Sequence, residues 1–423
     1  MNTDYFPNTS ALAYAFIGGL SISQALFIAP LATHVIHLYG TKVCLYVGVF
    51  FETLSLIGAS FAHQKYQIIL AQGVCFGWGM GFLFVGSVGI IPQWFLKRRS
   101  VANAVAASGS GMGGLIYSLA MQRIIDTLGL HWAFRVLGIC SFTVNLTASS
   151  LLRDRNKQTG ARHRAFDIGI LKRPEFVMLQ AWGCFSTLAY TILLFSLSAY
   201  GRAIGLSAKQ GSILGAILNL GQMLGRPFIG LSSDRWGRLN LASLFTLLCG
   251  VFCFAFWIPG EVVSNPMGLL SFFAIVGGAL AGTFWTTIAP VAAEILGLKD
   301  LPGGLSLTWI LMVAPTTCAE VIALELRRNG AKHWVYLPPE LFTAVMFVAG
   351  ALSLWIVRAW KVGEMEQRAR WMREQGSTRQ DESVIAAENA VAGQYRVEKP
   401  STNAVEIWAP QVLLKNMFVW KKV

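Results

Sequence analysis

The chain has 423 residues, of which 54% are hydrophobic and only 13% charged, and its mean hydropathy is +0.54. Soluble globular proteins carry about 25% charged residues, so this composition excludes an ordinary soluble domain and predicts an all-α polytopic membrane protein. The net charge of +13 comes mainly from basic residues between apolar runs, which favours a signal for membrane orientation over nucleic-acid binding.

Eleven apolar segments follow one another along the chain, each near the ~20 residues that a helix needs to cross a hydrocarbon core of ~30 Å. The predicted spans are 11–33, 43–62, 67–91, 100–122, 133–152, 176–200, 210–231, 239–259, 267–293, 302–324 and 340–358. All seven cysteines lie inside them, without spacing typical of disulfides or metal sites, so we expect no metal or other cofactor. No cleavable signal peptide is evident.

Basic residues gather in four places that share one side of the membrane if the spans alternate. These are Lys97-Arg98-Arg99, the segment 153–173, Arg235 with Arg238, and the segment 358–373. Cytosolic segments carry an excess of Lys and Arg, so we expect this side and the C-terminus to be cytosolic, in the cell membrane. An odd number of spans then places Met1 outside, where Asn8 begins a glycosylation sequon.

A turn motif occurs twice, 197 positions apart. Pro30 and Gly40 enclose nine residues with an aromatic before the glycine, and Pro227 and Gly237 do the same. The same offset applied to the run 176–200 points before residue 1. The sequence therefore predicts a duplicated membrane unit that lacks the first helix of its first copy, either in the protein or through the gene model.

The predicted organisation has four parts. They are an N-terminal helix bundle without its first helix (1–152), a basic cytosolic linker (153–175), a C-terminal helix bundle (176–362) and a largely disordered cytosolic tail (363–423). The end of the tail, 404–423, is unexpectedly apolar. We interpret it as a gene-model artefact in preference to a segment at the membrane surface.

Two motifs carry a family resemblance. The string GRPFIGLSSDRWGR, which runs from Gly225 to Arg238, resembles the loop signature of the major facilitator superfamily. The string WFLKRRSVANAVAASG, from Trp94 to Gly109, is similar to the signature entering helix 5 of monocarboxylate transporters. The segments 108–114 and 153–155 resemble the fungal branch. The resemblance implies two six-helix bundles, with eleven spans present here, and a substrate site between them near the bilayer midplane.

The resemblance also implies roles for particular residues. Arg226 matches an arginine that holds the substrate carboxylate, which suits the planar fork of a guanidinium. The alternative is that it reaches the membrane interface or supports Asp234. Gln222 stands where the family has an acidic residue for the coupling proton. The switch between conformations is assigned to Asp234, Arg235, Gly237, Arg238, Lys97, Arg98 and Arg99.

Further candidates come from polar and aromatic residues inside spans, where ionisable groups are costly and usually functional or paired. Glu52 and Glu320 are candidate proton sites, although Glu52 could lie in a helix seam and Glu320 could pair with Arg327 or Arg328. Glu294 is expected to be structural. Candidate substrate contacts are Arg226, Asn219, Gln222 and Glu320. Four aromatics could line a cavity but more commonly face lipid in such positions: Trp182, Tyr190, Phe284 and Trp285.

These observations predict a secondary transporter that moves a small organic acid or a similar metabolite by alternating access, with efflux of a fungal secondary metabolite favoured. One alternative is proton-coupled uptake of a monocarboxylate or vitamin. Another is a non-transporting sensor or an inactive truncated transporter. The expected partners are a small-molecule substrate and the lipid bilayer. No nucleic-acid partner, no nucleotide (no phosphate-loop motif occurs) and no enzymatic activity are expected.

Overall fold

The computed structural model describes residues 11–95, 97–159, 168–328, 333–374, 407–419 and 421–423. Within these ranges the chain forms helices joined by short turns and contains no strand. Asn8 lies outside the described residues, as do 160–167 of the expected linker and 375–406 of the expected tail. The fold is therefore all-α, as the composition predicts.

The first half of the chain forms the helical segments that correspond to the first five predicted spans. Its helices are α1 (Ala11–Phe27), α2 (Ala29–Tyr39), α3 (Thr41–Ala59), α4 (Lys65–Ile68), the π-helix η1 (Ile69–Cys75), α5 (Phe76–Val88), α6 (Ile91–Trp94), α7 (Arg99–Leu128) and α8 (Leu130–Leu151). Pro30 stands in the first turn of α2, where its missing N–H does no harm, and marks the break from α1. Gly40 turns the chain into α3 with φ of +87°, a conformation that favours glycine.

The second half begins with two short helices, α9 (Asn156–Thr159) and α10 (Ile168–Leu171), and then forms the helical segments that correspond to the last six predicted spans. Its helices are α11 (Pro174–Ala203), α12 (Ala208–Trp236), α13 (Arg238–Phe252), η2 (Cys253–Trp257), η3 (Ile258–Glu261), α14 (Pro266–Ala281), α15 (Thr283–Leu311), α16 (Val313–Leu326) and α17 (Leu337–Glu374). Ser207 begins α12 with a capping box, in which its side chain accepts from the Gln210 N–H and Gln210 returns the bond.

The eleven predicted spans each correspond to a helical segment of the structure. Eight stretches of the described residues are long and apolar enough to cross a membrane. One of them, Pro266–Leu326, has 61 residues and reverses at Gly297, whose φ is +77°. The helices α7 and α12 are also long enough, with 30 and 29 residues, but are not among the eight.

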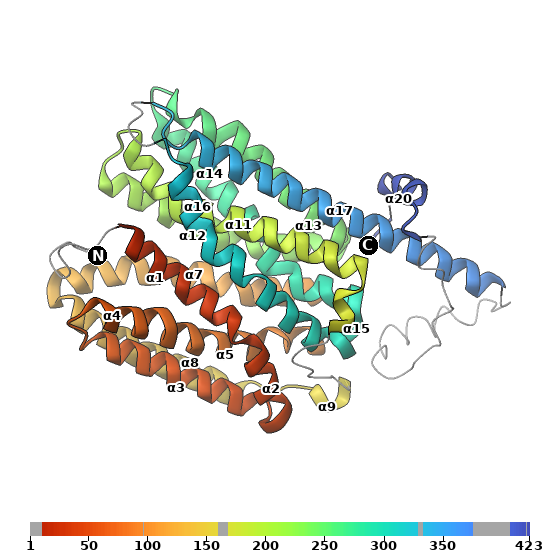
Figure 1. The fold of residues 1–423 in the computed structure, drawn as a ribbon, viewed down its shortest axis with the longest axis horizontal. Helices are drawn as coiled ribbons and strands as arrows, with labels where there is room; N and C mark the ends of the chain where they lie inside the picture. The colour runs from red at the N-terminus through yellow and green to blue at the C-terminus, as the bar shows by residue number, and fades with distance from the viewer. Residues whose placement is uncertain (1–10, 96, 160–167, 329–332, 375–406, 420) are drawn as a thin grey trace.

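The helices form two bundles that meet along a seam (Figure 1). The red-to-orange half contains α1–α8, and the green-to-blue half contains α11–α17. Across the seam, α7 packs against α12 and α15, while α1 packs against α16 and α2 against α15. Small residues allow the close approach: a Cβ placed on Gly230 would lie 2.5 Å from that of Ala104.

One end of the molecule, here called the basic end, carries the four predicted basic places. It contains the α6–α7 connection, the α12–α13 turn at Gly237 and the last turns of α17. In Figure 1 this is the end near α2, α9 and α15. Arg238 and Lys361 at this end form ion pairs with Glu294 and Glu364, respectively. These pairs therefore neutralise part of the positive charge of the basic end.

The end of the chain differs from the prediction for 404–423. The described residues 407–419 and 421–423 contain α20 (Pro410–Met417) and pack against α17 and the start of α13. The buried Arg358 donates to the carbonyl oxygens of Asn416, Met417 and Val419 at 3.3, 3.0 and 2.6 Å. The Leu239 N–H donates to the Val423 carbonyl at 3.0 Å.

Candidate functional site

Arg226 lies at the centre of the seam and is only 3% exposed. Its Nη1 donates to the Ala107 carbonyl at 2.5 Å and to the Ser110 Oγ, both on α7 of the other bundle. Its Nη2 donates to Gln222 Oε1 at 2.7 Å, one turn earlier on α12. A guanidinium has five N–H donors, so these three bonds leave two unused. One of the two is the Nε–H, and Nε is buried without a partner among the described residues.

The charge of Arg226 is not neutralised by an acidic side chain among the described residues. All three acceptors are neutral oxygens. Opposite Nε lies Gly282, and a Cβ there would stand 3.0 Å from that nitrogen. A buried charge is costly unless it is paired, so the guanidinium suits an anion, but its Nε–Nη2 edge is packed against Gly282 in this structure.

Gln222 joins Arg226 to the helix α11. Its Oε1 accepts from the Tyr190 hydroxyl at 3.0 Å as well as from Arg226. The sequence placed Gln222 and Arg226 together, and the structure agrees. Asn219, in contrast, donates to the Gly215 carbonyl of its own helix at 3.2 Å and faces Gly114 of α7.

Aromatic side chains continue the site from Tyr190 across the seam. The Trp285 ring is 6.3 Å from that of Tyr190 and stacks on Trp309 at 6.0 Å with 6° between the planes. Phe84 of the other bundle meets Trp309 at 4.9 Å and Trp285 at 6.2 Å. The expectation that Trp182 and Phe284 face lipid was wrong, because they are 0% and 2% exposed and pack together inside the C-terminal bundle.

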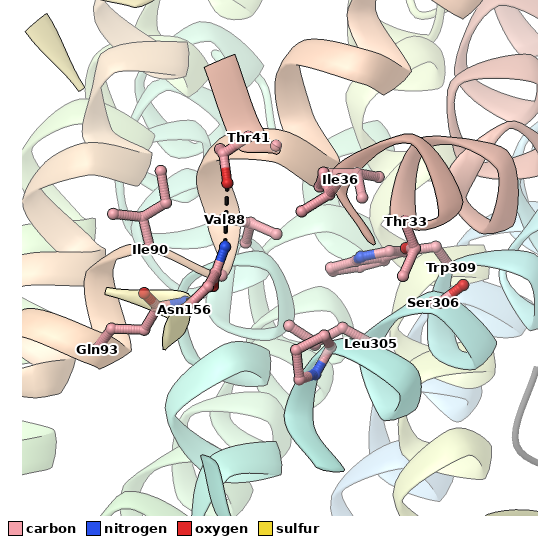
Figure 2. A pocket seen from close by; sticks show the side chains of 14 residues that line it. Thr33, Ile36, Thr41, Val88, Ile90, Gln93, Asn156, Leu305, Ser306 and Trp309 are labelled. Carbon is pink, nitrogen blue, oxygen red and sulfur yellow. Dashed lines mark hydrogen bonds between the residues drawn. The ribbon is translucent and has the colours of Figure 1, made fainter. Parts of the chain in front are cut away.

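A small cavity of about 40 Å³ lies between the bundles toward the basic end (Figure 2). Trp309 and Ser306 line it from α15, and Thr33 faces them from α2. Two hydrogen bonds join polar side chains that line the other side of the cavity. The Gln93 amide donates to the Asn156 side chain at 2.8 Å, and the Asn156 amide donates to the Thr41 hydroxyl at 3.1 Å. Sequence reasoning missed Trp309, since one tryptophan in an apolar span gives no signal of its own.

A second polar cluster fastens the two bundles at the basic end, and we call it the latch: Asp234, Arg238, Glu294 and Ser100. The Asp234 carboxylate accepts from the N–H groups of Ser100 and Val101 at 3.2 and 3.0 Å. Those groups belong to the first turn of α7, where N–H donors lack partners within the helix. Asp234 thus caps a helix of the other bundle.

Arg238 completes the latch by holding both acidic groups. It lies 3.2 Å from Asp234 and 2.6 Å from Glu294, and its Nε donates to the Ser100 Oγ at 3.0 Å. Gly237, with φ of +107°, makes the turn that positions it. Of the other predicted switch residues, Arg99 is buried and donates to the Phe95 carbonyl at 3.1 Å. The remaining three are exposed and outside the latch: Lys97, Arg98 and Arg235.

The two candidate proton sites lie away from Arg226. Glu52 of α3 accepts a hydrogen bond from the Asn145 amide of α8 at 2.6 Å, between two helices of the N-terminal bundle. Glu320 lies on α16, and its Oε2 is buried without a partner. Among the described residues no ion pair joins it to Arg327, which instead donates to the Tyr336 hydroxyl at 3.1 Å.

Comparisons with known proteins agree with this architecture. The family model of the Major Facilitator Superfamily matches residues 7–308. The chain is 32% identical over 377 residues to the probable transporter MCH2 of Saccharomyces cerevisiae, covering 88% of this chain and 78% of that protein. It is 26% identical over 344 residues to the fujikurins efflux protein of Gibberella fujikuroi, covering 81% and 73%.

Solved structures give the same fold. The proton:xylose symporter XylE superposes with a TM-score of 0.67 at 13% identity, covering 82% of this chain and 87% of that one. The Escherichia coli fucose:proton symporter FucP gives 0.64 at 13% identity, covering 82% and 92%. The predicted resemblance to fungal members of the superfamily is confirmed. The chain therefore belongs to the Major Facilitator Superfamily and is a multi-pass membrane transporter.

Proposed function

We propose that the protein exports a small organic acid, or a metabolite that carries an acidic group, by alternating access between its two bundles. The observation that carries this proposal is the buried, unneutralised Arg226 at the seam. Its Nε–H is unpaired, and the Nε–Nη2 edge of a guanidinium has two parallel donors, which is the geometry that a carboxylate prefers. Its remaining bonds go to both bundles, so a bound anion would sense their relative position.

Efflux is favoured because Gln222, the neighbour of Arg226, cannot take up a proton. A relative of this chain is named as the efflux protein of fujikurins, which supports the same direction. We place the basic end in the cytosol, since cytosolic segments carry the excess of Lys and Arg, and we place the protein in the cell membrane. In that orientation the latch closes the cytosolic side.

Proton-coupled uptake is the second candidate, and one observation favours it. The Glu320 carboxyl has a buried oxygen without a hydrogen-bond partner. Such a group can exchange a proton as its surroundings change during transport. It lies on α16, which packs against α1 of the other bundle.

The test is the flux and binding of labelled carboxylates and their neutral amide analogues, with the full chain in sealed vesicles. Arg226→Ala removes the fork and should weaken carboxylate binding by ~1.5–3 kcal/mol, or roughly ten- to hundredfold. Arg226→Lys keeps the charge without the planar fork and should also weaken it. Arg202→Ala, at an exposed arginine of α11, is the matched control.

Unchanged carboxylate affinity in Arg226→Ala, at a normal amount of protein in the membrane, would contradict the anion site and point to a neutral cargo. Binding without flux in the parent protein would favour the non-transporting alternative. A flux that requires an inward proton gradient and is lost in Glu320→Gln would favour uptake over efflux.

A further inference from the structure

The aromatic cluster of Phe84, Trp285 and Trp309 is the part of the seam that the proposed anion site leaves unexplained. Phe84 belongs to α5 and the two tryptophans to α15, so their contacts at 4.9 and 6.2 Å join the two bundles. If the bundles part during transport, Phe84 must leave the indole rings. Aromatic faces would then be open to a flat apolar partner.

Two indole N–H groups in this cluster have no acceptor. The Nε1 atoms of Trp285 and Trp309 are buried and have no hydrogen-bond partner. The Trp309 side chain is 0% exposed and lines the cavity. A buried donor without a partner costs free energy, and buried tryptophans usually find an acceptor. The cluster therefore has apolar indole faces and, at the edges of the rings, two N–H donors that no acceptor among the described residues satisfies.

The cluster is continuous with Arg226. Gly282 faces the Arg226 Nε and stands about one helical turn before Trp285. Tyr190 connects the two places from another helix, since its hydroxyl donates to Gln222 and its ring is 6.3 Å from Trp285. Tyr190 therefore connects the Gln222–Arg226 pair with the indole rings.

We propose that Trp285, Trp309 and Phe84 form a ring-binding subsite, so that the cargo is an organic anion with a flat ring system that carries oxygen or nitrogen acceptors. This inference rests on the proposed transport of organic acids and names their class. The acid group binds the Nε–Nη2 edge of Arg226. The ring takes the place of Phe84 against the indoles, and its acceptors receive the two unpaired N–H groups.

The experiment measures binding of carboxylates of graded shape to the purified full chain by titration calorimetry. The probes are benzoate, 4-methoxybenzoate and 1-naphthoate, compared with acetate, butyrate and the non-planar cyclohexanecarboxylate. We expect the flat ring acids to bind at least tenfold more tightly than the others. Trp309→Leu should remove most of this preference and leave the aliphatic acids unchanged, while Trp309→Phe should reduce only the additional affinity for 4-methoxybenzoate.

Trp257→Phe is the matched control, because Trp257 is also fully buried with an unpaired Nε1 but stacks on Phe273 inside the C-terminal bundle. The subsite is refuted if flat and non-planar acids bind equally, or if Trp309→Leu weakens all acids alike. If flat and non-planar acids bind equally but all of them still require Arg226, the proposed transport of organic acids would stand without the ring-binding subsite. Binding of no carboxylate at all would overturn both proposals.

Discussion

The latch makes a quantitative prediction through Asp234→Asn. The amide keeps one oxygen acceptor and loses the other, so one of the two N–H groups at 3.2 and 3.0 Å loses its partner. The negative charge that faces Arg238 and the first turn of α7 is also lost. A hydrogen bond to a charged group contributes ~1.5–3 kcal/mol, so the ratio of open to closed basic ends should rise roughly ten- to hundredfold.

The assay is the labelling rate of a cysteine placed in the closed seam. Ser233→Cys is nearly isosteric, and Ser233 is 0% exposed with its Oγ 3.4 Å from the Ser100 Oγ. In a background without the seven native cysteines, a water-soluble maleimide should reach this position much faster when Asp234 is Asn. Glu325→Gln, the same chemical change at an exposed residue of α16, should have no effect.

A labelling rate within twofold of the parent, at equal amounts of protein in the membrane, would refute the latch. Loss of the protein from the membrane would assign Asp234 a structural role instead, because the carboxylate would then be needed for folding and not for the balance between two states. Net flux should change more than the amount of protein if the latch controls opening.

Two further predictions concern buried side chains. Gln222→Glu places a negatively charged side chain beside the Arg226 Nη2, which is 2.7 Å from the amide oxygen in the parent protein. The affinity for carboxylate ligands should therefore fall at neutral pH and recover as falling pH protonates Glu at this position. An affinity that does not change with pH would contradict this. Arg358→Gln removes the donors to the carbonyl oxygens of Asn416, Met417 and Val419, so the backbone amides around them should exchange with solvent at least tenfold faster. The control Lys422→Ala, at an exposed residue, should leave the exchange rate unchanged.

Much of the site depended on information that no single segment contains. Arg226 was named from its motif, but its acceptors Ala107 and Ser110 are more than a hundred positions away. Nothing local indicates that the Asp234 carboxylate caps α7 or that Trp309 meets Phe84. A cluster of this kind forms only when separate helices are packed together.

The sequence by itself determined the membrane class, the order of the apolar helical segments, the duplicated turn at Gly40 and Gly237 and the superfamily. Those features depend on short stretches of sequence. The free energy of placing a segment in a bilayer is a sum over the residues of that segment. A turn with positive φ favours glycine wherever it occurs. The tertiary structure alone decided which polar groups share the seam, that Trp182 and Phe284 are buried, and that residues 407–423 are held by Arg358. Burial and pairing depend on what the other bundle or the other helix supplies, and that is fixed only when the helices pack.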